Sequence, residues 1–308
     1  MLNPNELQVF LAAAETRSFS GAARKLYLTQ PAVSQQIQAL ERRLKVELFE
    51  RKAGRIALTA AGEELLPLAR QLVNQALYIQ ESMAAHRGVV TGRLRIGCTT
   101  TPGKYILPWL AGSFCQMYPQ VHISIQVIPR SDLVCRLQRE EISFGIMSGQ
   151  IEGADLNYDE VMQDELVLVT PLDHPFAQEG KIALERLKEE TIILREEHAG
   201  TRVTMLEGLE RAGLDLDSLQ FAPFELGAAE GVIAAVRAGW GISWVSKVAV
   251  MCAVEMGKIG IVEVEGLRLQ RTIYLVSSRL RIETNAHRKF YEYVLSSEGR
   301  SILAQLGA

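Results

Sequence analysis

Residues 21–44 read GAARKLYLTQPAVSQQIQALERRL, and this stretch predicts two helices separated by a tight turn. The alanine-rich segment Gly21–Leu26 predicts the first helix, which either Ser18 or Ser20 can cap with its hydroxyl oxygen. Tyr27–Thr29 then turn the chain.

The second helix begins at Gln30 or Pro31, because proline is tolerated where first-turn amides have no helical partner. Its apolar residues follow at steps of four, three and four positions, which is the spacing of one buried helix face. These residues are Val33, Ile37, Leu40 and Leu44. An earlier helix is predicted on the same grounds from Leu7, Phe10, Leu11 and Ala14.

The exposed face of the second helix carries amides where an ordinary solvated face would carry Glu and Lys. Gln30, Ser34, Gln35 and Gln38 all lie away from the buried face. Amides and hydroxyls both donate and accept hydrogen bonds, so they can read the edges of bases. A short helix, a tight turn and a second helix form the helix-turn-helix layout, whose second helix enters the major groove. The alternative is a structural three-helix unit whose polar face happens to favour amides.

Basic residues surround this helix. Those that can hold phosphates, and so position the protein without specifying sequence, are Arg24, Lys25, Arg42 and Arg43. Leu48 and Phe49 are predicted to fill the core. Arg51–Arg55 predict a basic turn between two short extended pieces, which is either a wing that contacts DNA or an ordinary solvated hairpin tip.

The charge distribution agrees with a polyanionic partner for this module. Residues 1–60 hold nine Lys or Arg against five Asp or Glu, a balance of +4, whereas the remainder holds 24 against 31, a balance of −7. A basic module on an acidic body predicts that the first 60 residues contact a polyanion.

A long helix follows, which Thr59 can cap and which Pro67 is expected to bend near its start. Its apolar residues repeat at alternating steps of four and three, the seam of two helices that pack side by side. The predicted dimerisation residues are Leu65, Ala69, Leu72, Ala76, Ile79 and Met83. The alternative is that this stripe docks onto the chain's own body. The sequence GVVTG at 88–92 then predicts a hinge.

From about residue 93 onward, short β-rich runs alternate with helical patterns. The runs are RLRIG (93–97), HISIQVI (122–128), ISFGIM (142–147), ELVLVT (165–170), TIILR (191–195), GISWVS (241–246), IGIVEV (259–264) and RTIYLV (271–276). This alternation predicts α/β architecture with a mainly parallel sheet, in one lobe or two.

Composition indicates an ordinary soluble protein, with 48% hydrophobic and 22% charged residues. The chain shows no apolar run long enough to span a membrane and no signal-peptide pattern at its start. The four cysteines are scattered without a CxxC pair, which suits a reducing compartment and favours buried thiols over a redox sensor. We therefore expect a cytoplasmic location.

Together these features resemble the LysR-type transcriptional regulators. The match is densest in FSGAARKLYLTQPAVSQQIQALERRLKVELFERKAGRIALTAAG (19–62), where Ala-Ala, Thr-Gln-Pro-Ala-Val-Ser, Leu-Glu, Leu-Phe-x-Arg and Leu-Thr-x-x-Gly stand in the family's register. Less specific matches follow in GRLRIGCTTTPGKYILP (92–108), EEHAGTR (196–202) and GVIAAVRAGWGISWVS (231–246). The chain departs from the family at Gln35, where a basic residue is common, which leaves the base preference open.

The resemblance implies an N-terminal winged helix-turn-helix, a long linker helix that dimerises, and a two-lobed periplasmic-binding-protein-like effector domain. The expected boundaries are 1–59 for the DNA-binding domain, 60–88 for the linker helix and 89–308 for the effector domain. Within the last, lobe one comprises residues 93–162 and 270–308, and lobe two comprises residues 163–268. The family also implies promoter DNA, a small anionic effector and RNA polymerase as partners, and self-association to a homodimer or homotetramer. The predicted DNA-binding residues are Arg24, Thr29, Gln30, Pro31, Ala32, Ser34, Gln35, Gln38, Arg42, Arg51 and Arg55.

Three turns are candidates for the effector site, because ligands of open α/β sheets bind beyond the carboxyl ends of strands. They are Cys98–Gly103, His198–Arg202 and Leu226–Ala229. Hydroxyls and free amides at helix starts favour an anion, although Ser and Thr cap helices everywhere. The predicted effector-binding residues are Thr99, Thr100, Thr101, Ser148, Gly200, Thr201, Arg202 and Gly227.

Two other functions remain as alternatives. An enzyme with a helical arm is one, but the chain carries no GxSxG, P-loop, HExxH or spaced CxxC motif, and its five histidines lack ligand spacing. A solute-binding module that senses without DNA is the other. We therefore expect a regulator rather than an enzyme, with no catalytic residue, cofactor or metal site.

Overall fold

The computed structural model describes residues 2–52, 55–151, 155–279 and 284–307. The chain divides into two compact units. The first is formed by Met1–Gly92 with the short stretch Leu280–Ala286, and the second by Arg93–Arg279 with His287–Ala308.

The first unit begins with three short helices, α1 (Pro4–Thr16), α2 (Phe19–Leu26) and α3 (Gln30–Leu44). Each has a polar N-cap whose side chain accepts a first-turn amide, and these caps are Asn3, Ser18 and Thr29. The expected pair of helices around a tight turn is therefore present, and Ser18 rather than Ser20 is the cap.

The core of this unit joins all three helices to the segment that follows them. Leu7, Phe10, Val33 and Leu40 are fully buried. The Phe49 ring lies 5.5 Å from both the Phe10 and Phe19 rings, measured between centroids. Leu48 is buried beside them, so the prediction that Leu48 and Phe49 fill the core is confirmed.

A hairpin of β1 (Phe49–Lys52) and β2 (Arg55–Leu58) follows, paired antiparallel. The Glu41 carboxylate of α3 accepts hydrogen bonds from the backbone amides of Leu48 and Phe49 at 2.8 and 3.3 Å. These two bonds attach the start of the hairpin to α3. Ala53 and Gly54, the tip of the predicted wing, lie outside the described residues.

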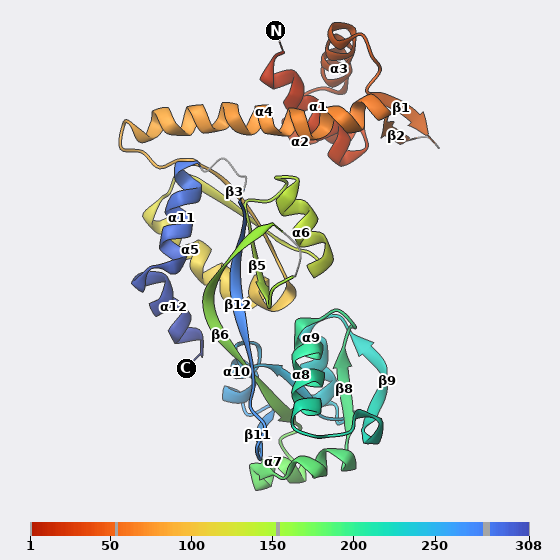
Figure 1. Cartoon of the computed structure of the whole chain (residues 1–308), viewed down its shortest axis with the longest axis vertical. Helices are drawn as coiled ribbons and strands as arrows, with labels where there is room; N and C mark the ends of the chain where they lie inside the picture. Colours follow the sequence, from red (N-terminus) through yellow and green to blue (C-terminus); the bar gives the residue numbers. More distant parts are fainter. Residues whose placement is uncertain (1, 53–54, 152–154, 280–283, 308) are drawn as a thin grey trace. The chain divides into compact units, whose positions relative to one another are not determined.

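The long helix α4 spans Ala60–Ala85 without interruption at Pro67, and Thr59 caps it as expected (orange in Figure 1). The threonine hydroxyl accepts the Gly62 amide at 3.1 Å and donates to the Glu47 carbonyl at 2.7 Å. A β-carbon at Gly62 would lie only 2.3 Å from the Leu48 carbonyl oxygen, so the close approach of α4 to the core requires glycine here.

The second unit contains strands β3 (Gly92–Cys98), β4 (Val121–Val127), β5 (Phe144–Ser148), β6 (Leu156–Thr170), β7 (Lys181–Ile182), β8 (Thr191–Arg195), β9 (Gln220–Leu226), β10 (Ser243–Ser246), β11 (Gly260–Val264) and β12 (Leu269–Ser278). Its helices are α5 (Leu107–Met117), α6 (Arg130–Gln138), α7 (Pro175–Glu179), α8 (Gly200–Arg211), α9 (Ala229–Arg237), α10 (Lys247–Glu255), α11 (Asn285–Leu295) and α12 (Ser297–Gly307). A π-helical turn η1 (Pro102–Ile106) precedes α5, and 3₁₀ turns η2 (Leu184–Glu189) and η3 (Leu216–Ser218) lie farther along the chain.

The sheet is mixed, so the expectation of a mainly parallel sheet is wrong. The strand order is β4-β3-β5-β12-β6-β11-β7, with β10 on β6, and β8 and β9 form a separate pair. Pairs β3–β5, β8–β9 and β11–β7 are parallel, but every described partner of β6 is antiparallel to it. The reason is that β12 pairs along its whole length with Leu156–Leu166 of β6, so the two strands form an antiparallel ribbon (Figure 1). The sequence run at 165–170 marked only the second part of β6.

The ribbon passes between separate hydrophobic cores. One cluster, which includes Leu133 and Met147, draws only on residues of predicted lobe one. Two others, around Trp244 and Val232, draw on residues of predicted lobe two and on Leu269 at its edge. Strands β6 and β12 are thus shared by both sets of cores.

A buried ion pair joins β6 to β12 where the chain crosses. Arg271 Nε and Nη2 each lie 2.8 Å from the same oxygen of Asp164, and only Nε has hydrogen-bond geometry. The other Asp164 oxygen accepts the Ser246 hydroxyl at 2.6 Å. The Asp164 side chain is wholly buried, so its charge depends on these partners.

Within the described ranges, none of the helices combines the length and the apolar character that a membrane crossing requires.

We predict that Gly62→Ala lowers the free energy of unfolding by about 1–3 kcal/mol, because the new methyl group collides with the Leu48 backbone. Urea unfolding monitored by circular dichroism measures the change. Gly112→Ala is the matched control, since no atom lies within 4 Å of its β-carbon position in helix α5. That control should stabilise the protein by up to about 1 kcal/mol. Equal effects of the two substitutions would contradict the steric argument.

We also predict that Asp164→Ala destabilises the protein by about 3–5 kcal/mol, because it leaves the Arg271 guanidinium buried without its counter-ion. The double variant Asp164→Leu, Arg271→Met removes both charges and should lose less stability than the single variant. Urea midpoints of the three proteins test this order. A double variant less stable than Asp164→Ala would show that the charge itself is not the cause.

Candidate functional site

Helix α3 presents its polar face to solvent and buries the opposite one. Val33, Ile37 and Leu40 are at most 2% exposed. Of the predicted DNA-binding residues, Arg24, Thr29, Gln30, Pro31, Gln35, Gln38, Arg42 and Arg51 are exposed, and Ala32 and Ser34 are half-buried. The side chain of Arg55 lies outside the described part of the structure.

Local hydrogen bonds organise this face. The Gln30 amide donates to the Ser34 hydroxyl at 2.8 Å, one helical turn away. The Thr29 hydroxyl caps α3 by accepting a hydrogen bond from the Ala32 backbone amide. Farther along the helix, Arg42 Nε donates to the Gln38 carbonyl at 3.3 Å. The side chains of Gln35 and Gln38 are exposed in the N-terminal part of α3, the part of a recognition helix that contacts base edges in a helix-turn-helix protein.

Tyr27 was treated only as a turn residue from the sequence, yet its side chain is 96% exposed. It adopts a left-handed conformation, with φ of 55°, as the C-cap of α2. A large aromatic ring held out at the turn is available to a partner beside α3. The only sequence signal for it is an aromatic residue in the turn Tyr27–Thr29.

The predicted dimerisation stripe of α4 is divided between two environments. Leu65 and Ala69 pack against the core of the first unit, as the alternative interpretation expected for the whole stripe. Leu72, Ile79 and Met83 are exposed. Leu68, which is absent from the predicted dimerisation residues, is 56% exposed. It lies one helical turn before Leu72 and extends the same exposed face toward the start of α4.

In the second unit, two of the predicted effector segments follow neighbouring parallel strands. Strands β3 and β5 pair in parallel with Cys98 opposite Ile146, and the Thr99 amide donates to the Ile146 carbonyl at 3.1 Å. Thr99 and Ser148 consequently lie at the same edge of the sheet, beyond the carboxyl ends of both strands. Thr101 is buried at the start of η1, and Thr100 is half-buried.

The start of α8 meets this edge. A β-carbon at Gly200 would lie 2.2 Å from the Ser148 hydroxyl oxygen, so glycine at this position lets the Ser148 hydroxyl lie against the start of α8. The neighbouring Thr201 hydroxyl accepts Nη1 of Arg271 at 3.0 Å. The structure therefore brings together Ser148, Gly200 and Thr201 with Arg271, which sequence reasoning missed because nothing in a β-rich run distinguishes an inward-facing arginine.

The N-terminus of α8 lacks two features that would neutralise it. Its N-cap is Ala199, which has no side chain to accept the first amides, and no acidic residue stands in its first turn. Helix α9 also has an alanine cap, Ala228, but Glu230 occupies its first turn. Of these two helices, α8 is therefore the one whose partial positive charge no first-turn carboxylate offsets.

Two arginines near these turns, Arg202 and Arg195, are already paired with carboxylates. Arg202 contacts Glu225 and donates to the Arg195 carbonyl at 3.1 Å. Arg195 is buried, pairs with Glu196 at 2.8 Å and also donates to the carbonyls of Leu226 and Gly227. Nη1 of Arg202 is therefore already engaged, and the predicted Gly227 contributes its carbonyl to Arg195.

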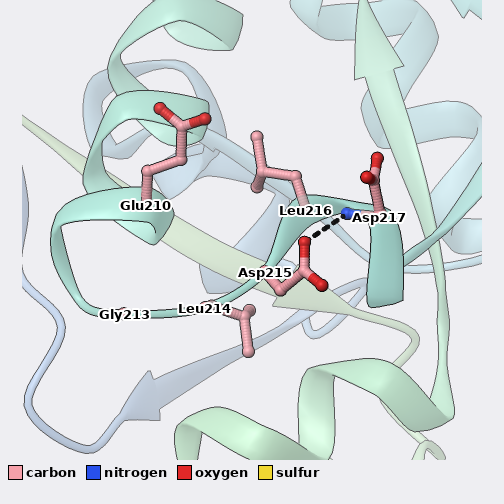
Figure 2. Close-up of a pocket in the computed structure, with 6 residues that line it drawn as sticks. All are labelled: Glu210, Gly213, Leu214, Asp215, Leu216 and Asp217. Carbon is pink, nitrogen blue, oxygen red and sulfur yellow. Dashed lines mark hydrogen bonds between the residues drawn. The ribbon is translucent and has the colours of Figure 1, made fainter.

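A separate hollow of about 550 Å³ lies at the far end of α8, lined by Glu210, Gly213, Leu214, Asp215, Leu216 and Asp217 (Figure 2). Asp215 Oδ1 accepts the Asp217 amide at 3.1 Å. None of the predicted effector residues lines this hollow, and its three carboxylates disfavour an anion.

The cysteines differ from the sequence expectation of buried thiols. Cys98 is buried and Cys115 is half-buried, but Cys135 and Cys252 are exposed. Burial raises the pKa of Cys98 to about 12 and also raises the pKa of Cys115. Among the residues that the structure describes, no cluster of His, Cys, Asp and Glu could hold a metal ion.

Comparison with known families accounts for both units. Residues 4–63 match the family described as "Bacterial regulatory helix-turn-helix protein, lysR family". Residues 87–298 match the "LysR substrate binding domain".

Curated relatives match along nearly the whole chain. The HTH-type transcriptional activator CmpR of Synechocystis sp. is 32% identical over 302 residues, which is 98% of either chain. The RuBisCO operon transcriptional regulator of Allochromatium vinosum is 33% identical over 295 residues, 96% of either chain.

Solved structures of LysR-type regulators also resemble this chain in fold. Full-length CbnR complexed with its target DNA is 25% identical, with a TM-score of 0.65 over 95% of this chain and 99% of that one. The Synechocystis CcmR regulatory domain in complex with 2-PG is 29% identical, with a TM-score of 0.61 over 67% of this chain and 96% of that one. The family is one of regulators and not of enzymes, and the chain belongs to it: this is a LysR-type DNA-binding transcriptional regulator.

Proposed function

We propose that the exposed face of α3 reads promoter DNA and that a small anionic metabolite bound by the second unit modulates this binding. The single observation that carries the first part is the solvent-facing row of Gln30, Gln35 and Gln38 opposite a buried apolar face. Arg24, Arg42 and Arg51 hold phosphates on either side, and Ser34, Thr29, Pro31 and Ala32 complete the helix start. Arg55 belongs to the same wing by its place in the sequence.

The proposed effector site lies at the start of α8. Its first amides, the hydroxyls of Ser148 and Thr201, and the guanidinium of Arg271 converge on one region, while Thr99, Thr100 and Thr101 line the neighbouring turn. These groups all donate hydrogen bonds, which suits a carboxylate or a phosphate. The CcmR regulatory domain was solved with 2-PG, so 2-PG is the first ligand to test. Arg202 and Gly227 are secondary candidates, because each already serves another partner.

Self-association through α4 is proposed from the exposed face formed by Leu72, Ile79 and Met83, with Leu68 beside them. Two copies of α3 would then read two half-sites of a symmetric operator. We place the DNA-binding domain at 1–59, the linker helix at 60–88 and the two-lobed effector domain at 89–308. A dimer or tetramer that works with RNA polymerase in the cytoplasm completes the proposal.

We expect Gln35→Ala and Arg51→Ala to weaken operator binding in different ways. Arg51→Ala removes a phosphate contact, so affinity should fall for every DNA sequence, and the slope of log K against log salt should decrease by about 1. Gln35→Ala removes a base contact, so it should cost about 1–3 kcal/mol on the operator with an unchanged salt slope. Gel-shift titrations at several salt concentrations measure both quantities.

Arg237→Ala is the matched control, since Arg237 is an exposed arginine on α9 of the second unit. It should bind the operator like the wild type. Unchanged binding by both Gln35→Ala and Arg51→Ala would refute the assignment of this face.

For the effector site, we expect 2-PG to raise the melting temperature of the wild type in proportion to the logarithm of ligand excess. Thr201→Val should abolish most of that shift, because it removes a hydroxyl while nearly preserving the side-chain shape. Thr204→Val, in the middle of the same helix, is the control. An equal 2-PG shift in wild type and Thr201→Val would exclude the α8 start as the site.

A further inference from the structure

One cluster of side chains near the effector turns has no part in the site described above. Lys104 Nζ of η1 lies 2.8 Å from Glu230 Oε1 in the first turn of α9. Lys104 belongs to lobe one and Glu230 to lobe two, so this ion pair connects the two lobes directly, away from the strands that cross between them.

A second residue reinforces the pair. The Tyr105 hydroxyl is within hydrogen-bonding range of the same Glu230 carboxylate. Burial and, after it, the Glu230 charge raise the pKa of Tyr105 to about 12. Burial alone would raise the pKa of Glu230, but hydrogen bonds from Lys104, from its own backbone amide and from Tyr105 outweigh it, so that this pKa is lowered. Glu230 is therefore a carboxylate that pairs with Lys104 of the opposite lobe and lies near the next residue, Tyr105.

The position of this cluster connects two of the predicted effector turns. Lys104 and Tyr105 directly follow the turn Cys98–Gly103, and Glu230 directly follows the turn Leu226–Ala229. The ion pair holds these turns toward each other. A ligand that contacts both lobes binds more tightly to an arrangement in which the lobes are already close.

We infer that Lys104, Tyr105 and Glu230 form a latch between the lobes, which raises the population of the closed effector domain and thereby tightens effector binding. The latch is adjustable because its ion pair is exposed, with 38% and 47% of the two side chains accessible. Exposed pairs contribute little and are screened by salt, so the latch biases the closure without locking it. The expected change in effector affinity rests on the proposed function. The expected change in the distance between the lobes does not.

Interlobe distance tests the latch without any ligand. The chain already carries one exposed cysteine in each lobe, Cys135 on α6 and Cys252 on α10. The raised pKa values of Cys98 and Cys115 leave little thiolate near neutral pH, so a nitroxide maleimide selects the exposed pair. Full-length labelled protein, diluted with unlabelled subunits, reports the Cys135–Cys252 distance distribution by pulsed dipolar spectroscopy.

Glu230→Gln and Lys104→Met should each broaden this distribution and shift it from that of the wild type. The charge-swapped protein, Lys104→Glu with Glu230→Lys, should return toward the wild type, and 0.5 M salt should make the wild type resemble the single variants. Lys289→Met is a matched control, because it breaks an exposed ion pair of nearly the same length, 2.9 Å to Glu292, within the single helix α11. It should leave the distribution unchanged.

Calorimetric titration with 2-PG then measures the consequence for binding. Glu230→Gln should weaken 2-PG binding by about two- to fivefold, the range expected for an exposed pair. If the wild type does not bind 2-PG, the ligand assignment fails while the distance measurement still decides the latch. Single variants whose distance distribution equals that of the wild type, or a charge swap that restores nothing, would overturn the inference.

Discussion

The antiparallel ribbon of β6 and β12 is the constraint on which the second unit depends. Both strands continue from one set of hydrophobic cores into the other, and their backbone pairing runs from Leu269 with Leu166 to Ser278 with Leu156. Asp164 and Arg271 pin the ribbon by a buried ion pair that also holds Ser246 and Thr201. Because Thr201 opens α8, the residue that secures the crossing also orients the helix start where we place the effector. One guanidinium thus contacts both Asp164 at the crossing and Thr201 at the start of α8.

Four cationic side chains near the predicted effector turns form ion pairs. Arg195, Arg202, Arg271 and Lys104 each have a carboxylate partner, so positive charge near the turns is compensated in pairs. We place the anion at the start of α8 and at the hydroxyls around it, where backbone amides can hold a small ligand. The exposed pair of Lys104 with Glu230 lies outside this proposed site.

In the first unit, packing and hydrogen bonds orient the polar face of α3 toward solvent. Helix α3 gains its position from its buried apolar face, and Glu41 ties its second half to the hairpin through two amides. Gly62 and Thr59 in turn hold the start of α4 against the same segment. The Leu-Glu and Leu-Thr-x-x-Gly motifs are thus explained by backbone contacts, whereas the side chains of Gln30, Gln35 and Gln38 are exposed on the surface of α3.

The sequence by itself determined the helices of the first unit, the Thr59 cap, most of the strands and the family, because these depend on local periodicity and on residues whose spacing is read directly. Residues whose role depends on partners distant along the chain were decided only by the tertiary structure. Leu65 and Ala69 share the spacing of Ile79 and Met83, yet they pack inward because the three-helix core covers that end of α4. Arg202 was expected at the effector but faces Glu225, and Arg271 was not expected but stands beside Thr201. The mixed sheet also depends on contacts between distant segments. Whether two strands run parallel or antiparallel depends on which segments become neighbours in the sheet, and local periodicity does not contain that information.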